Sequence, residues 1–188
     1  SGEGGALLVN DPALAERAEI IREKGTNRSQ FFRGQVDKYT WVDIGSSYLP
    51  GEIIAAFLWA QMEEAEEITA RRLAIWARYH DAFAPLERAE RVRRPVIPDG
   101  CGHNAHMYYL LLRDREGRDA FIKAMKNAGI SCIFHYVPLH RAPQGKKIGR
   151  AADSLPVTTD LADRLVRFPL WLGLEESQER VIDTALQF

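Results

Sequence analysis

Apolar side chains recur every three or four positions through residues 51–85, the longest stretch of helical periodicity in the sequence. Pro50 and Gly51 precede this stretch, and Pro85 follows its last apolar position. The pattern predicts one long helix, long enough to link two domains. The apolar positions are Ile54, Phe57, Leu58, Met62, Ala65, Ile68, Leu73, Trp76, Tyr79 and Phe83.

Two shorter elements are predicted before this helix. Residues 6–9 form an apolar run that favours a short buried strand. Asp11 is suited to cap a helix whose first residue is Pro12, and Gly25 is suited to end it. The apolar stripe of that helix consists of Leu14, Ala18 and Ile21.

Residues 26–48 alternate between polar and aromatic side chains without a sustained period. A long irregular stretch in a compact protein is usually functional or disordered, and aromatic residues argue against disorder. We therefore expect this segment to pack against another surface, such as a second subunit.

Residues 86–188 change to short alternating units, which predict a small α/β domain. Strands are expected at 107–112 and 130–137, with a helix at 117–127 between them that Gly129 ends. A loop rich in Gly and Lys is expected at 144–150, followed by a helix through 161–165. A last helix is expected at 175–186, with Val181, Ile182 and Leu186 facing inward.

The composition is that of a globular protein outside membranes. The 188 residues are 46% hydrophobic and 27% charged, with a formal net charge of −1. This charge gives no reason to expect nucleic acid, and no apolar run is long enough to span a bilayer. Cys101 and Cys132 lack metal-binding spacing, so we expect two reduced thiols in a cytoplasmic protein.

The most distinctive polar cluster is His-Tyr-Val-Pro-Leu-His at residues 135–140. It follows a predicted buried strand, where ligand contacts collect in α/β folds. His135 and His140 could contact a ligand oxygen, or they could be structural histidines with satisfied hydrogen bonds; the residues alone favour neither. A zinc site is less favoured, because the two histidines flank a proline and no third ligand lies nearby.

Residues 1–5, Ser-Gly-Glu-Gly-Gly, lack the spacing of a phosphate-binding loop and favour a tight turn. A glycine-rich turn at the very start, leading directly into a strand, suggests a piece of a longer protein rather than a tag remnant. The residues by themselves therefore indicate an α/β fragment, in which the two histidines are a candidate for a ligand site or for a structural role.

Several of these stretches together resemble the DegT/DnrJ/EryC1/StrS sugar aminotransferases. The resemblance rests on residues 1–5, on the helix end at 22–25, on 43–56 and on 135–140, and it is most specific over 17–49. It implies part of a type I pyridoxal-phosphate fold. Residues 1–50 would be the remnant of the large cofactor-binding domain with a dimer loop, 51–85 the interdomain helix, and 86–188 the small carboxy-terminal domain.

The resemblance also implies an activity for the parent protein. It would move an amino group from glutamate to the C4 ketone of dTDP-4-keto-6-deoxyglucose, as a homodimer with pyridoxal phosphate. In the family the cofactor lysine lies in a Lys-Asn-x-x-Ser pattern, which places it upstream of Ser1. The chain alone is then expected to lack the catalytic lysine and not to retain the cofactor. The alternative is a non-catalytic module that only binds a partner subunit or a nucleotide sugar.

Site residues are implied only where they match the family's motifs. A family Gly-x-Asn-x-Arg stretch, which contacts the cofactor phosphate of the neighbouring subunit, matches Gly45, Ser47 and Leu49, so serine and leucine replace asparagine and arginine. Ser47 is the expected phosphate contact. The expected substrate contacts are His135, Tyr136, His140, Asn27 and Arg28, and no metal ligand is implied.

Overall fold

The computed structural model of the protein describes residues 2–152 and 154–188. The contacts divide the chain into two compact units, Ser1–Glu64 and Ala65–Phe188. Ser1, the first residue of the predicted glycine-rich turn, lies outside the described residues.

The first unit contains the helices α1 (Pro12–Arg22), α2 (Arg28–Phe32) and α3 (Glu52–Glu63). The predicted cap of α1 is confirmed: Oδ1 of Asp11 accepts a hydrogen bond from the backbone N–H of Ala13 at 2.9 Å. Gly25, with φ of +75°, turns the chain after the helix as expected. No residue of α1 is buried, and Leu14 of the predicted stripe is 58% exposed.

The predicted strand at residues 6–9 is wrong. These residues form no strand and no backbone bridge among the described residues, and Leu7 and Leu8 are 78% and 86% exposed. A strand exists only where a neighbour satisfies its backbone groups, and an apolar run by itself does not supply that neighbour.

The single helix predicted over 51–85 is divided in the structure. α3 ends at Glu63, Glu64 is not helical, and α4 (Ala65–Ala82) follows, with the short α5 (Ala84–Arg88) after it. Glu63, Glu64, Glu66 and Glu67 bring like charges three and four positions apart, which disfavours an unbroken helix at this point.

The second unit contains the sheet. Its remaining elements are β1 (Tyr108–Leu111), α6 (Arg115–Asn127), β2 (Ile133–Phe134), η1 (Leu139–Arg141), α7 (Pro143–Ile148), α8 (Pro156–Arg164), β3 (Leu165–Phe168), η2 (Leu174–Glu176) and α9 (Gln178–Leu186).

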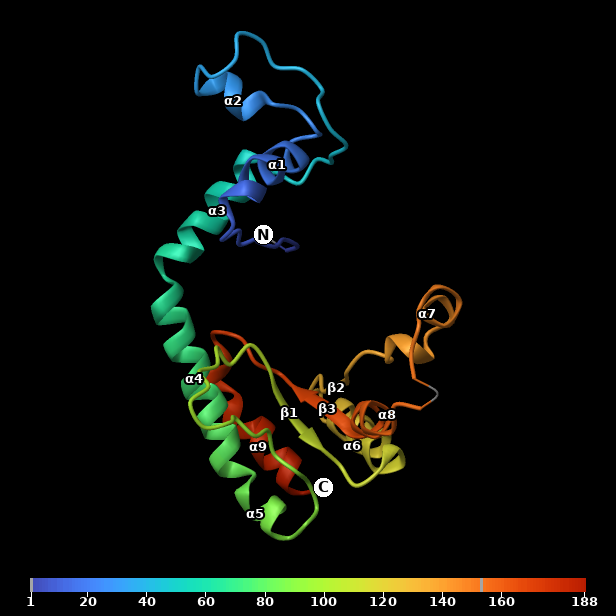
Figure 1. Ribbon diagram of the computed structural model, residues 1–188. Helices are drawn as coiled ribbons and strands as arrows, with labels where there is room; N and C mark the ends of the chain where they lie inside the picture. The colour runs from blue at the N-terminus through green and yellow to red at the C-terminus, as the bar shows by residue number, and fades with distance from the viewer. Residues whose placement is uncertain (1, 153) are drawn as a thin grey trace. The chain divides into compact units, whose positions relative to one another are not determined.

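The three strands are antiparallel, and β3 lies between β1 and β2 (Figure 1). The strand predicted at 107–112 and the helix predicted at 117–127 are confirmed as β1 and α6. The central strand β3 was not predicted. Its register places Arg167 opposite Tyr109 on one side and Ile133 on the other, so β3 decides which side chains share the second face of the sheet.

The core lies on the first face of the sheet, where α4, α6 and α9 cover it. Phe83 and Phe168 lie 5.1 Å apart between ring centroids, and the Tyr79 hydroxyl donates to the backbone carbonyl of Pro169 at 3.1 Å. Burial of each such ring stabilises the fold by about 2–3 kcal/mol. The largest fully buried side chains include Tyr79, Tyr108, Phe83, Ile75, Leu110 and Met125.

Three predictions for this unit need correction. The predicted strand at 130–137 shrinks to the two residues of β2, and Ile133 and Phe134 are about half exposed because β2 is an edge strand. The predicted loop at 144–150 contains α7, which begins at a proline, a favourable first residue of a helix. In α9, Val181 and Ile182 face inward as predicted, but Leu186 is 36% exposed.

Candidate functional site

The first unit is held together by a close crossing of two glycines. Gly25 is buried, and a Cβ atom placed on it would lie 1.8 Å from the backbone oxygen of Asp43. A Cβ atom on Gly45 would lie 2.1 Å from the backbone nitrogen of Gly25. The backbone of Ser46 also donates to the carbonyl of Ile21 at 3.0 Å. The segment around Gly45 is therefore fixed against the carboxy-terminal end of α1.

This crossing positions Ser47. Ser47 pairs with Glu23 in an isolated antiparallel bridge, in which Lys24 N–H donates to the Ser46 carbonyl and Tyr48 N–H donates to the Arg22 carbonyl. Ser47 itself is exposed, and among the described residues neither its N–H nor its hydroxyl has a hydrogen-bond partner. The backbone N–H and the hydroxyl of Ser47 are thus two donors at a fixed, exposed position, where they can donate hydrogen bonds to a phosphate oxygen.

Asn27 has a structural role in the same unit. Its side-chain Oδ1 accepts a hydrogen bond from the N–H of Thr40 at 2.8 Å, and its own N–H donates to the Thr40 carbonyl at 3.2 Å. These two bonds close the irregular segment on itself. Sequence reasoning named Asn27 as a substrate contact, and the structure adds that its carbonyl oxygen is already engaged.

Arg28 belongs to the same network as Ser47. Its guanidinium pairs with Glu23, the bridge partner of Ser47, at 3.3 Å, and it lies over the rings of Phe32 and Tyr39 at 5.1 and 5.8 Å. The guanidinium remains partly exposed. Glu23 thus lies between the two residues: its side chain pairs with Arg28, and its backbone forms the bridge with Ser47.

A second cluster of predicted site residues lies in the other unit, where His135 and Tyr136 follow β2. Their ring centroids are 5.0 Å apart, and Nδ1 of His135 is buried without a partner among the described residues. The pKa of His135 is lowered, mainly by burial and then by the charges of Arg167 and His106. His135 is therefore neutral at pH 7.

Arg167 is a member of this cluster that sequence reasoning missed. Its guanidinium carbon lies 5.8 Å from the Tyr136 ring centroid, and its Nε is buried without a hydrogen-bond partner among the described residues. Burial of the Arg167 Nε and the His135 Nδ1 without hydrogen-bond partners costs free energy of folding, unless a ligand or water pairs with them. The only sequence signal is the apolar, charged, apolar order of Val166, Arg167 and Phe168, which is too short to predict a strand.

His140 belongs to different surroundings. Its Nε2 lies 3.3 Å from the Thr159 hydroxyl of α8, and its neighbour Arg141 forms an ion pair with Asp163 of the same helix at 3.2 Å. No hydrogen bond joins His140 to His135 in the described residues. The motif at 135–140 therefore divides between the Arg167 cluster and the surface of α8.

The remaining reactive groups form no further centre. Burial raises the pKa of the Cys132 thiol to about 12, and Cys101 is exposed. No group of three or more potential metal-binding side chains gathers in residues 2–152 and 154–188. Over the same ranges, no helix has both the length and the apolar character that crossing a bilayer requires.

Comparison with known proteins decides the family. The family described as the DegT/DnrJ/EryC1/StrS aminotransferase family matches residues 1–186. The chain belongs to this family.

Relatives in the DegT/DnrJ/EryC1/StrS family differ in the sugar position at which they act. The chain is 28% identical over its whole length to dTDP-4-dehydro-2,3,6-trideoxy-D-glucose 4-aminotransferase of Saccharopolyspora spinosa, and covers 48% of that protein. It is also 28% identical, over 97% of its length, to dTDP-3-amino-3,4,6-trideoxy-alpha-D-glucose transaminase of Micromonospora megalomicea subsp. nigra, and covers 46% of it. The chain thus spans about half the length of the curated relatives it matches.

Solved structures of the family agree in fold. DesV of S. venezuelae superposes with a TM-score of 0.80 and 26% identity, over 96% of this chain and 45% of that one. A DegT/DnrJ/EryC1/StrS aminotransferase of Brucella abortus superposes with a TM-score of 0.78 and 25% identity. The match covers 95% of this chain and 44% of that one. The expected α/β fold, matching about half of a type I pyridoxal-phosphate sugar aminotransferase, is therefore confirmed.

Proposed function

We propose that the chain is the carboxy-terminal part of a pyridoxal-phosphate aminotransferase that acts on dTDP-4-keto-6-deoxyglucose. Glutamate would donate the amino group to the C4 ketone, giving dTDP-4-amino-4,6-dideoxygalactose. The observation that carries the proposal is the family match over residues 1–186. Choice of C4 rests on the resemblance over residues 17–49, because relatives of equal identity act at C3 and at C4.

The described residues fit a role in holding the cofactor. When bound, pyridoxal phosphate supplies the aldehyde and the electron sink through which an amino group passes from donor to ketone. Ser47 offers a hydroxyl and a backbone N–H, held in place by the glycine crossing, to a phosphate oxygen. A hydrogen bond to a charged acceptor contributes about 1.5–3 kcal/mol. We propose that Ser47 makes this contact across the subunit interface of a homodimer.

The Arg167 cluster fits the anionic part of a nucleotide sugar. Because His135 is neutral at pH 7, Arg167 supplies the positive charge, and the imidazole and the Tyr136 hydroxyl supply hydrogen bonds. A diphosphate oxygen would give the buried Nε of Arg167 the acceptor that it lacks in the described residues. We propose that this cluster orients the sugar nucleotide, with His140, Asn27 and Arg28 as further substrate contacts.

Binding of an anion at this cluster should also change the protonation of His135. Arg167 lowers the pKa of His135, so an anion that offsets the charge of Arg167 raises that pKa again. Binding then takes up a proton at Nδ1 or Nε2 as the pH falls below about 6.5. Affinity for the sugar nucleotide should increase over the same interval.

The test is an assay of the protein produced from its complete gene. Purified protein is incubated with glutamate and dTDP-4-keto-6-deoxyglucose, and the product is analysed for an amino group at C4. A dTDP-linked 3-keto-6-deoxysugar serves as the matched substrate. Turnover of the 3-keto sugar alone would contradict the C4 assignment, and turnover of neither would contradict the substrate class.

The second candidate is a module that only binds a partner subunit or a nucleotide sugar. It is supported by the binding contacts that Ser47 and the Arg167 cluster offer. The 188-residue chain is mixed with pyridoxal phosphate, reduced with borohydride and digested. We expect no single modified lysine and no turnover from this chain alone. A stoichiometric adduct at Lys24 or another single position, with turnover, would exclude the module.

We also propose a cytoplasmic homodimer for the parent protein. The aromatic segment of the first unit supports the dimer, because Trp41, Tyr48 and Phe32 are 74%, 68% and 69% exposed. Sedimentation of the complete protein tests this assignment, and a monomer at micromolar concentration would contradict it.

A further inference from the structure

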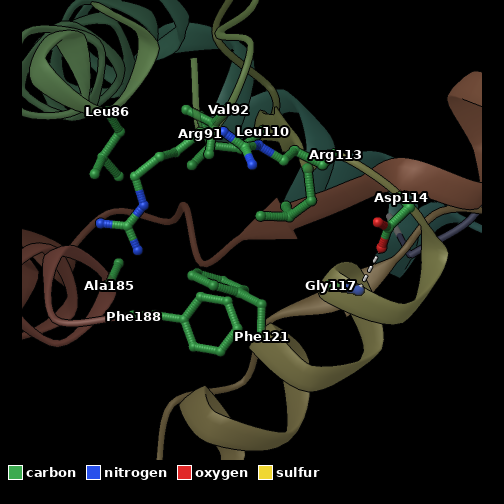
Figure 2. A pocket seen from close by; sticks show the side chains of 11 residues that line it. Leu86, Arg91, Val92, Leu110, Arg113, Asp114, Gly117, Phe121, Ala185 and Phe188 are labelled. Atoms are coloured by element: carbon green, nitrogen blue, oxygen red, sulfur yellow. Dashed lines mark hydrogen bonds between the residues drawn. The ribbon is translucent and has the colours of Figure 1, made fainter. Parts of the chain in front are cut away.

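A cavity of about 420 Å³ lies within the second unit, between α5, β1, α6 and α9 (Figure 2). Its inner wall is apolar, with Leu110 and Phe121 among the most buried side chains of the chain. Arg91 and Arg113 stand at its rim. Volumes of this order accommodate small organic ligands. The cavity uses none of the residues assigned to the cofactor or to the sugar nucleotide.

The two arginines are brought together by backbone pairing. Arg93 and Leu111 exchange two backbone hydrogen bonds, of 2.9 and 3.0 Å, in an antiparallel bridge. Arg91 lies two residues before Arg93 and Arg113 lies two residues after Leu111, and both line the same cavity. Two positive charges at one rim repel each other, and an anion bound there offsets that repulsion.

Few acidic groups of the described chain offset this charge. Neither Arg91 nor Arg113 forms an ion pair with a described residue, and Nε of Arg113 donates to the backbone carbonyl of Glu90 at 3.3 Å. Asp114 also lines the cavity, but its Oδ1 accepts from the N–H of Gly117 at 2.7 Å and so caps α6. The rim therefore carries two guanidinium groups against one engaged carboxylate.

The opposite side of the cavity suits a flat hydrocarbon group. Phe121 and Phe188 meet edge to face, with centroids 5.1 Å apart and ring planes at 88°. Phe188 is 41% exposed, so part of this aromatic wall is in contact with solvent. Aromatic ligands gain from such edge contacts in addition to the area they bury.

We propose that this cavity is a binding site for an amphipathic anion, an aromatic ring that carries a carboxylate or a phosphate. The ring lies against Phe121 and Phe188, and the oxyanion lies between the guanidinium groups of Arg91 and Arg113. A planar guanidinium binds either oxyanion through two parallel N–H donors. The proposal is independent of the aminotransferase assignment, since no reaction step is involved.

Calorimetry with the full chain tests the ligand class. The probes are phenyl phosphate, phenylacetate, the neutral phenylacetamide and inorganic phosphate. We expect the two aromatic anions to bind at least about tenfold more tightly than either control, because each control lacks one of the two contacts. The ratio of the two anion affinities identifies the preferred oxyanion. Equal binding of phenylacetamide, or of inorganic phosphate, would overturn the proposal.

Three variants locate the site. Arg91→Gln and Arg113→Gln should each weaken the aromatic anions about tenfold, and Phe188→Ala should weaken them while leaving inorganic phosphate unchanged. Arg88→Gln is the matched control: it removes one exposed charge of α5 without touching the cavity, and should change affinity less than about twofold. If Arg88→Gln loses as much affinity as Arg91→Gln, the effect is one of net charge, and the proposed site is contradicted.

Discussion

A Cβ atom on Gly45 would lie 2.1 Å from the backbone nitrogen of Gly25, so the two glycines cross with no space for a side chain. Gly25 in addition has φ of +75°, a conformation that side chains other than hydrogen disfavour. The position of Ser47, two residues after Gly45, depends on this crossing.

Gly45→Ala should lower the free energy of unfolding by about 2 kcal/mol or more, because backbone atoms must move to admit the methyl group. Gly51→Ala is the matched control, since a Cβ atom there meets nothing within 4 Å. Urea titration followed by near-ultraviolet circular dichroism measures both. Equal stability of the two variants would contradict the crossing.

Ser47→Ala and His135→Ala should affect different ligands of the complete enzyme. Loss of the Ser47 hydroxyl should speed cofactor dissociation about tenfold and leave the KM for the sugar nucleotide unchanged. His135→Ala, and to a smaller extent His140→Ala, should raise that KM and leave the cofactor spectrum unchanged. Melting temperatures are measured alongside. Histidine variants that lose stability but keep a normal KM would show the histidines to be structural.

Arg167→Gln should raise the pKa of His135, because it removes a positive charge that disfavours the imidazolium. Proton NMR titration of the five histidines resolves the shift, and His135→Gln assigns the resonance. The lowering of the His135 pKa that remains in Arg167→Gln then measures mainly the effect of burial, which is the larger cause. An unchanged His135 titration in Arg167→Gln would separate the two residues and remove Arg167 from the cluster.

The free energy of unfolding should fall as the pH is lowered through the range below about 6.5. Burial, and then the charge of Arg94, lowers the pKa of His80 from its ordinary value of 6.5, against smaller opposite effects of Glu87 and Asp81. The unfolded chain therefore binds the proton first. His80→Phe keeps the stacking on Trp76 and should flatten the pH dependence of urea midpoints between pH 5 and 6.5, roughly the histidine range. A slope unchanged from the parent chain would contradict this assignment.

The chain should self-associate through α3. No residue of this helix is buried, and Ile53, Phe57 and Trp59 are 86%, 65% and 64% exposed. Apolar surface gains about 25 cal/mol per Å² when it leaves water. Light scattering should show oligomers of the parent chain. Phe57→Lys should convert them to monomers, whereas Glu52→Lys, at the start of the helix, should leave them intact. A monodisperse parent chain would contradict the prediction.

Local signals determined much of the secondary structure. The Asp11-Pro12 cap and the helix end near Gly25 follow from backbone chemistry within a few residues, and the structure confirms both. α6 was equally predictable from its apolar spacing and from Gly129. The family, too, could be recognised from the sequence, because its motifs are contiguous runs of residues.

Only the tertiary structure decided which elements pair and which side chains meet. β3 has four residues, too few for a period, and it becomes a strand because β1 and β2 satisfy its backbone on both sides. Residues 6–9 have a stronger apolar run but lack such neighbours in the described chain, so they form no strand, and Leu7 and Leu8 stay exposed.

Long-range strand pairing also explains why the sequence predicted only part of the observed site. His135 and Tyr136 were visible as a motif, but their contact with Arg167 depends on the sheet register, which links positions about thirty residues apart. The meeting of Arg91 and Arg113 at one cavity likewise depends on a bridge between distant segments, Arg93 with Leu111. Sequence spacing determines local conformation, whereas long-range backbone pairing determines which side chains meet.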